Sequence, residues 1–159
     1  MSDTIRVKIA DLATKKDEGI LITVGLGSCI GIALYDPVAR TAGLAHILLS
    51  DSTMFRTHAN PAKFADTAIP VLIGEMVAQG AKTSRLRAKI AGGSKLFSFE
   101  KSLLSVGEKN IQSVRDTLAG LRVPIIGEDV GGSVGRTMRL FVADGKVTVS
   151  TVGAGEREI

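Results

Sequence analysis

The chain has 159 residues, of which 45% are hydrophobic, and it carries a formal net charge of +4. We expect one domain over residues 1–159, because this length and composition supply enough apolar material for a single core. The basic residues are scattered and few residues are aromatic, which argues against nucleic-acid binding. No run of about 18 apolar residues is present, so we expect no membrane insertion. A single cysteine without an apolar signal stretch indicates a cytoplasmic protein.

The first elements predicted in chain order are strands. Residues Ile5–Ile9 alternate apolar with basic side chains, as a half-buried strand does. A polar connector over Thr14–Gly19 leads to a second predicted strand, Ile20–Val24. Two apolar runs follow, Cys29–Tyr35 and Thr41–Leu49, and the Asp-Pro sequence between them is typical of a turn. Because neither run alternates with polar residues, we expect a hairpin that is covered on both faces.

Helices and further strands are predicted in the rest of the chain. The Asn60-Pro61 pair offers an N-cap and a first helical residue for a helix over 61–79. A second helix is expected over Glu108–Leu118, where apolar residues share one face. Residues Gly153–Ile159 are expected to form a flexible tail. The remaining predicted strands are Leu86–Ala91, Val123–Glu128, Met138–Val142 and Val147–Val152.

The hairpin places the only cysteine opposite a histidine. If the turn spans Asp36 to Ala39, Cys29 faces His46 directly across the two strands. Directly opposed residues carry their Cβ atoms roughly 4.5 to 5.5 Å apart, close enough for a thiol to bond an imidazole. A slip of one residue would send the two side chains to opposite faces, so this prediction depends on the turn.

Glycines surround the cysteine on the N-terminal side. For Thr23 to reach Cys29 or His46, the chain must reverse between them, and glycines at alternate positions in Gly25-Leu26-Gly27-Ser28 allow that reversal. Backbone N–H groups near the sulfur, at Gly27 and Ser28, are candidates to bind a substrate oxygen. The glycine pairs 92–93 and 131–132 indicate further tight turns near a functional surface.

Two interpretations of the cysteine remain open on the residues alone. A lone cysteine in an apolar strand is often an ordinary core residue. Its predicted opposition to a histidine instead favours a nucleophile with an adjacent base. The second histidine, His58, has no Asp, Glu or Cys at ligand spacing, so we expect no metal site, and His58 is interpreted as structural or substrate-adjacent.

Six segments in order resemble the CheD family of chemoreceptor glutamine deamidases: TVGLGSCIGIALYD, GLAHILL, NPAKFADTAI, KIAGGSKLF, GEKN and DVGGSVGR. The resemblance covers nearly the whole chain. It departs from the family pattern at Ser50, where proline is usual, and at Ala91, where bulkier residues are usual. It implies a catalytic triad of Cys29, His46 and Thr23, without any cofactor.

The resemblance also implies a function and a fold. The function is hydrolysis of glutamine side-chain amides on the helices of methyl-accepting chemoreceptors, and a CheC-type phosphatase is an implied partner. The fold is α+β, with mixed, largely antiparallel sheets packed as a sandwich and two or three helices outside it. This agrees with the predicted strands.

The expected mechanism is nucleophilic. An imidazolium at His46 would lower the pKa of the Cys29 thiol, the thiolate would attack the carboxamide carbon, and water would clear the thioester. A papain-like protease is disfavoured, because no glutamine precedes Cys29 at the expected distance and His46 follows too closely. A non-catalytic module that binds receptor or adaptor helices is the alternative.

Overall fold

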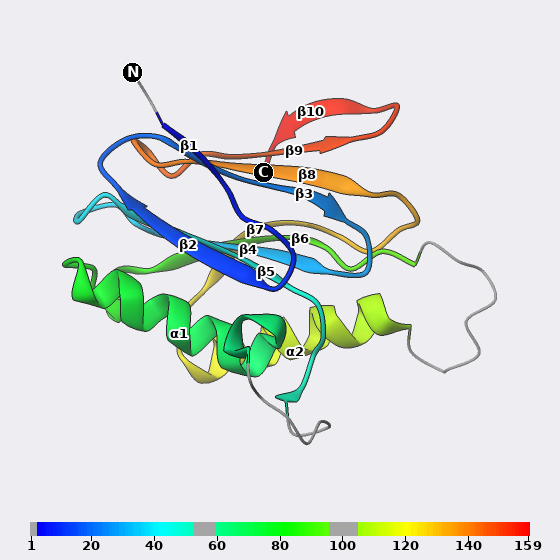
Figure 1. Ribbon diagram of the computed structural model, residues 1–159, viewed down its shortest axis with the longest axis horizontal. Coiled ribbons are helices and arrows are strands. Elements are labelled where there is room, and N and C mark those ends of the chain that lie inside the picture. The colour runs from blue at the N-terminus through cyan, green and yellow to red at the C-terminus, as the bar shows by residue number, and fades with distance from the viewer. Residues whose placement is uncertain (1–2, 53–59, 96–104) are drawn as a thin grey trace.

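The computed structural model describes residues 3–52, 60–95 and 105–159. Within these residues the chain forms two stacked β-sheets, and both α-helices lie against the outer face of one of them (Figure 1). Most neighbouring strands are antiparallel, with one parallel pair in each sheet. This confirms the predicted α+β sandwich with helices outside it.

The first sheet has the strand order β1-β3-β8-β9-β10. Its strands are β1 (Thr4–Arg6), β3 (Ile20–Leu26), β8 (Arg136–Phe141), β9 (Val147–Thr151) and β10 (Gly155–Glu158). Strands β8 and β9 are joined by the predicted Asp-Gly turn, in which Gly145 has a φ of +80°. The hairpin at this position is therefore confirmed.

The second sheet has the strand order β2-β5-β4-β6-β7 and contains the hairpin with the cysteine. Its strands are β2 (Asp11–Lys16), β5 (Thr41–Ile47), β4 (Ile30–Asp36), β6 (Arg87–Gly92) and β7 (Ile125–Val130). Every residue of β4 and β5 is buried. One face of the hairpin packs on the first sheet and the other on the helices, which confirms the expected cover on both faces.

Side-chain caps begin the 3-10 helix that precedes α1 and begin α2 itself. A short 3-10 helix (Pro61–Lys63), whose first turn is capped by Asn60, precedes α1 (Ala65–Ala78). Helix α2 (Val106–Gly120) begins at Ser105, whose Oγ accepts a hydrogen bond from the Glu108 N–H. Both predicted helices are confirmed, and a second short 3-10 helix (Thr83–Arg85) leads into β6.

Two segments differ from the sequence-based expectation. The predicted polar connector begins inside β2, a largely half-buried edge strand that pairs with β5. The C-terminal residues are not a loose tail, because β10 pairs with β9 and Ile159 donates its N–H to Val147. Ion pairs from Arg139 to Glu156 and from Arg157 to Asp129 add to this pairing. These strands are polar and exposed, so they lack the alternating apolar pattern that would reveal them in the sequence.

Candidate active site

The hairpin register differs from the predicted one by two residues. Gly31 pairs with His46, and Asp36 pairs with Thr41, so the predicted direct opposition of Cys29 and His46 is wrong. The difference arises in the turn, where the Asp36 carboxylate accepts the N–H groups of Val38 and Ala39. Arg40 then adopts a φ of +50°, and the connection between Asp36 and Thr41 has four residues where the predicted turn has two.

A difference of two residues keeps the side chains on the same face. Cys29 lies two positions before Gly31, so it is the diagonal neighbour of His46. Such neighbours lie about 7 to 8 Å apart, within reach of a long side chain. Cys29 packs into the core between the sheets, and His46 bonds a residue of the first sheet on the same side. The structure therefore brings both residues to one face.

The imidazole of His46 is held by Thr23 on β3. The Thr23 hydroxyl donates to the Val7 carbonyl at 2.7 Å, and its oxygen lies 2.6 Å from His46 Nδ1. Because a hydroxyl has one proton and the carbonyl accepts it, Nδ1 must carry the proton that joins the ring to Thr23. The Nε2 atom therefore has a lone pair. It is buried and has no hydrogen-bond partner among the described residues, so the Cys29 thiol is not bonded to it in this structure.

Gly31 provides the space in which these groups meet. A Cβ atom at Gly31 would lie 2.8 Å from Met138 Sδ and 3.4 Å from Thr23 Cγ2. A side chain opposite His46 would thus push β3 away from β5. Because Gly31 has no side chain, Thr23 can approach the imidazole. This explains why glycine stands at this position of an otherwise bulky strand.

Cys29 lies on a segment that glycines bring close to β6. The Gly93 N–H donates to the Cys29 carbonyl at 2.8 Å, and a Cβ at Gly92 would lie 2.1 Å from that oxygen. Gly92 also has a φ of +111°, which other residues rarely adopt. The Gly131 N–H donates to the Gly92 carbonyl at 2.9 Å. Both predicted glycine turns thus lie beside the cysteine.

Burial favours the neutral forms of both Cys29 and His46. The Cys29 side chain is 6% exposed, and burial raises the pKa of its thiol, an effect that its own backbone N–H partly opposes. Burial lowers the pKa of His46 from 6.5 to about 4. Burial therefore opposes the predicted resting pair of thiolate and imidazolium, because it disfavours both charges. A neutral imidazole with a free Nε2 can instead take the thiol proton during attack.

This low pKa predicts a stability change in acid. The folded state loses the His46 proton near pH 4 and the unfolded state near 6.5, so the unfolded state binds more protons between these values. Stability from this source is present above about pH 6.5 and is lost as the pH falls toward 4, by about 2 to 3 kcal/mol. The free energy of unfolding, measured with urea at pH 7 and at pH 4.5, should show this loss.

Other groups titrate in the same pH range, so the unfolding free energy of the parent is compared with that of His46→Gln. The difference isolates the contribution of His46. The free-energy difference between parent and variant should be about 2 kcal/mol larger at pH 7 than at pH 4.5. A difference that does not change with pH would contradict a neutral, buried His46.

The segment before Cys29 leaves few backbone donors for a substrate oxygen. The Gly27 N–H is donated to the Gly25 carbonyl at 3.1 Å, within the reversal where Gly25 has a φ of +76°. The N–H groups of Ser28 and Cys29 take no other residue of the described chain as partner. Of the two predicted oxyanion candidates, Gly27 and Ser28, only Ser28 has an N–H without a partner among the described residues, while the Cys29 N–H faces its own sulfur.

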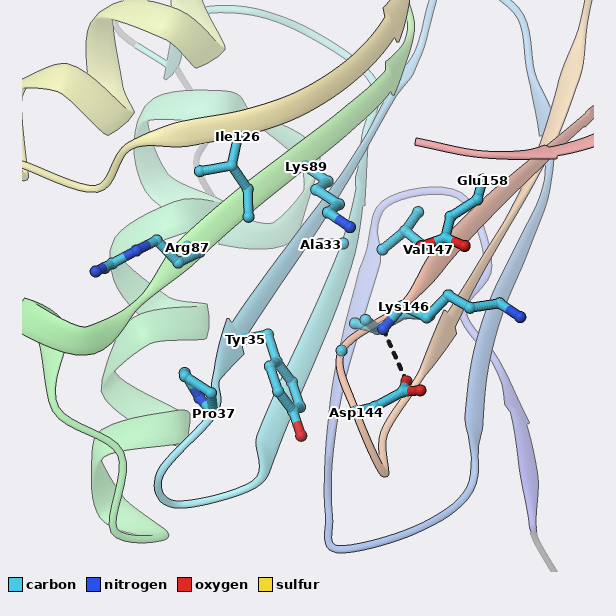
Figure 2. Close-up of a pocket in the computed structure, with 12 residues that line it drawn as sticks. Ala33, Tyr35, Pro37, Arg87, Lys89, Ile126, Asp144, Lys146, Val147 and Glu158 are labelled. Atoms are coloured by element: carbon cyan, nitrogen blue, oxygen red, sulfur yellow. Dashed lines mark hydrogen bonds between the residues drawn. The ribbon is translucent and has the colours of Figure 1, made fainter.

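A cavity of about 500 Å³ opens at the opposite end of the hairpin. Tyr35, Lys89 and Glu158 are among the residues that line it, as Figure 2 shows. Strand β4 runs from the cysteine toward this cavity, and Ala33, the first β4 residue that lines it, lies four residues or about 13 Å beyond Cys29. The cavity contains none of Cys29, His46 or Thr23, so it is separate from the candidate site.

Sequence reasoning missed three parts of the site. The Val7 carbonyl, which decides the histidine tautomer, is a backbone group without a sequence signal. Gly31 is a single glycine within a strand, which signals a close approach in general but not which one. Asn110 on α2 donates to the backbone beside the cysteine, and only its place in the GEKN segment could have drawn notice.

Other predictions about the site concern metals and membranes. No cluster of three or more potential metal ligands occurs in the part of the chain that the structure describes. His58 lies outside the described residues. Among the described helices, none has the length and apolar character to cross a bilayer.

The fold and the site together define an α+β sandwich with a candidate cysteine-dependent active site between its sheets. A family model described as "CheD chemotactic sensory transduction" matches residues 48–151. A relative from Clostridium botulinum (strain Alaska E43 / Type E3) is 53% identical over 98% of this chain and 97% of its own. One from Clostridium novyi (strain NT) is 52% identical over 99% and 98%. Both are named "Probable chemoreceptor glutamine deamidase CheD".

This chain belongs to the CheD family. A relative of the same name from Caldanaerobacter subterraneus subsp. tengcongensis is 44% identical over 99% of both chains. Among solved structures, the hypothetical protein YfiH of Bacillus licheniformis aligns with 72% of this chain and 46% of its own, at a TM-score of 0.44 and 14% identity. That similarity is too low to support an argument. The family match begins after His46, so the roles of the three site residues rest on their geometry.

Proposed function

We propose that this protein hydrolyses glutamine side chains of chemoreceptors to glutamate, with Cys29 as nucleophile, His46 as proton carrier and Thr23 as the residue that orients it. The names of relatives near 50% identity over the full chain support the reaction. The observation that carries the assignment of residues is the buried, unpartnered Nε2 of His46, held by Thr23 on the face it shares with Cys29.

The first half-reaction forms a thioester. The Cys29 sulfur attacks the carboxamide carbon while His46 Nε2 accepts the thiol proton, which gives a tetrahedral oxyanion and an imidazolium. The imidazolium then donates this proton to the amide nitrogen, and ammonia leaves. Catalytic hydrogen bonds are often long before substrate binds, so the absence of a bond between Cys29 and His46 at rest is compatible with this step.

The second half-reaction releases glutamate. His46 Nε2 accepts a proton from water, the resulting hydroxide attacks the thioester carbon, and the proton returns to the departing sulfur. In both halves the negative oxygen needs donors, which the N–H groups of Ser28 and Cys29 can supply. Thr23 is a neutral acceptor, so it stabilises the transient imidazolium less than a carboxylate would.

The reaction is tested directly with a glutamine-bearing fragment of a chemoreceptor cytoplasmic region. Incubation with the protein should release ammonia and convert particular glutamines to glutamates, each seen by peptide mass analysis. Backbone cleavage without this conversion would instead indicate a protease. A fragment that stays unmodified, with no ammonia released, would refute the proposal.

Replacing Thr23 with valine should reduce the rate without abolishing it. The variant leaves the His46 Nδ1–H without its acceptor, so the ring loses its orientation. We expect the rate of ammonia release to fall about 10- to 100-fold. Thr23→Ser keeps the hydroxyl and should recover most of the rate.

Thr41→Val is a matched control for Thr23→Val. Thr41 is also a buried threonine whose hydroxyl donates to a backbone carbonyl, but it lies at the far end of β5 from His46. It should keep the parental rate. Equal losses in both threonine variants would mean that Thr23 acts only through stability.

The burial and raised thiol pKa of Cys29 favour a second candidate, a non-catalytic module that binds receptor or adaptor helices. Iodoacetamide separates the two, because a cysteine with an adjacent base is alkylated in the folded protein and a sealed core cysteine is not. The chain has one cysteine, so any label reports on Cys29.

The remaining implications concern location and partners. Action on the signalling helices of receptors requires a location in the cytoplasm. A CheC-type phosphatase that competes for the site stays a prediction, and co-purification with a CheC-type protein, with loss of ammonia release on its addition, tests it.

A further inference from the structure

Asn110 on α2 is a fully buried polar residue that the proposed reaction does not use. Its side-chain nitrogen donates to the Ser28 carbonyl at 2.9 Å and to the Leu48 carbonyl at 3.1 Å. Its oxygen is buried and lacks a partner among the described residues. An unpaired buried acceptor is costly, so a fold that keeps one must need the two donors at this place.

The two carbonyls belong to the two ends of the hairpin that carry the reactive groups. Ser28 directly precedes Cys29, and Leu48 follows His46 by two residues. In the observed register Ile30 pairs with Ile47, so Leu48 is the next residue across from Cys29, beyond the last ladder pair. One carboxamide therefore joins the strands at the position where their own hydrogen bonding ends.

Close packing places α2 where Asn110 can make these bonds. A Cβ at Gly107, in the first turn of α2, would lie 2.4 Å from the Gly93 carbonyl, so the helix contacts the backbone of that segment. Gly93 and Ser94 in turn donate their N–H groups to Cys29 and Gly27. The helix start, the β6 end and the cysteine segment thus form one packed unit.

We propose that Asn110 is a positioning residue that sets the distance between Cys29 and His46 by joining their strands across the open end of the hairpin. This inference rests on the proposed function. It concerns a residue that does not touch the reacting atoms. The geometry makes it distinct from a general stabilising role, because one donated bond ends at the residue before Cys29 and the other at the residue across the hairpin from Cys29.

The test compares Asn110→Asp with a matched control, Ser113→Ala. Aspartate has the shape of asparagine but no donor when ionised. Ser113 lies on the same helix and donates its hydroxyl to the Ser50 carbonyl at 2.7 Å. This bond also joins α2 to the segment after β5, two residues beyond Leu48. Steady-state kinetics on the receptor fragment, alkylation of Cys29 by iodoacetamide and thermal unfolding are measured for each.

The expected result is a selective loss. Asn110→Asp should lower kcat about 10- to 100-fold with KM nearly unchanged, and it should slow alkylation of Cys29, while Ser113→Ala keeps both rates. A protonated aspartate regains one donor, so the ratio of variant to parental kcat should rise as the pH falls from 8 to 6. Asn110→Ser, measured in parallel, should show the kinetic loss without this pH dependence.

The inference is overturned if the Asn110 variants keep the kcat and alkylation rate of Ser113→Ala. It is also overturned if Asn110→Asp and Asn110→Ser fail to fold while Ser113→Ala folds, because Asn110 is then structural. Failure of the proposed function looks different, since the parent itself would then release no ammonia.

Discussion

Replacing Cys29 with alanine should abolish glutamine deamidation and leave the fold intact. Without the sulfur no thioester can form, so we expect the rate of ammonia release to fall at least about 10⁴-fold. The side chain is small and belongs to the core between the sheets, together with Ala91 and Met138. Its truncation should cost about 1 kcal/mol of stability.

Cys29→Ser is the companion variant. It keeps the size of the side chain and places a poorer nucleophile at the same position, so its rate should also be close to background. Circular dichroism and thermal unfolding confirm that both variants fold. If folded Cys29→Ala released ammonia from the receptor fragment at the parental rate, Cys29 would not be the nucleophile.

Replacing His46 with glutamine should lower the rate by about 10² to 10⁴-fold, because the variant has no group that can take the thiol proton. Glutamine retains a side-chain amide that can bond the Thr23 hydroxyl, so the change removes the base while a polar partner remains. The same substitution should slow alkylation of Cys29.

The pH dependence distinguishes loss of a base from a general disturbance. In His46→Gln only thiolate formed by bulk hydroxide can attack, and burial raises the thiol pKa above its ordinary value of 9.0. The variant's rate should therefore rise about tenfold per pH unit between 7 and 9. The parental rate should be nearly flat there, since His46 is already neutral. A variant with a flat profile would contradict the assigned role.

Local sequence was sufficient for the elements that carry the site. Apolar runs on either side of Asp-Pro predicted β4 and β5, and the glycines after Thr23 predicted the reversal that returns β3 to the hairpin. The hairpin strands and the reversal both depend on the backbone preferences of residues that are neighbours in the sequence. The proposal of Cys29, His46 and Thr23 as site residues could accordingly be made from the sequence.

The register of the hairpin was not a local property. The Asp36 carboxylate is bound by the Arg85 guanidinium and the Lys82 N–H as well as by its own turn. These distant contacts hold the carboxylate where it caps Val38 and Ala39. Burial raises the pKa of the Asp36 carboxyl, but the hydrogen bonds it accepts outweigh burial and keep this pKa below the ordinary value. The turn alone could not reveal that pairing begins at Thr41.

The sequence by itself determined which residues are available for chemistry and that Cys29 and His46 share a face of one hairpin. The tertiary structure decided how deeply both side chains are buried and which tautomer the histidine adopts. Charge depends on burial by a second sheet, and the tautomer depends on Thr23 donating to the carbonyl of Val7. It also decided the contact of Asn110 with both strands, because that contact needs a helix packed on glycines far along the chain.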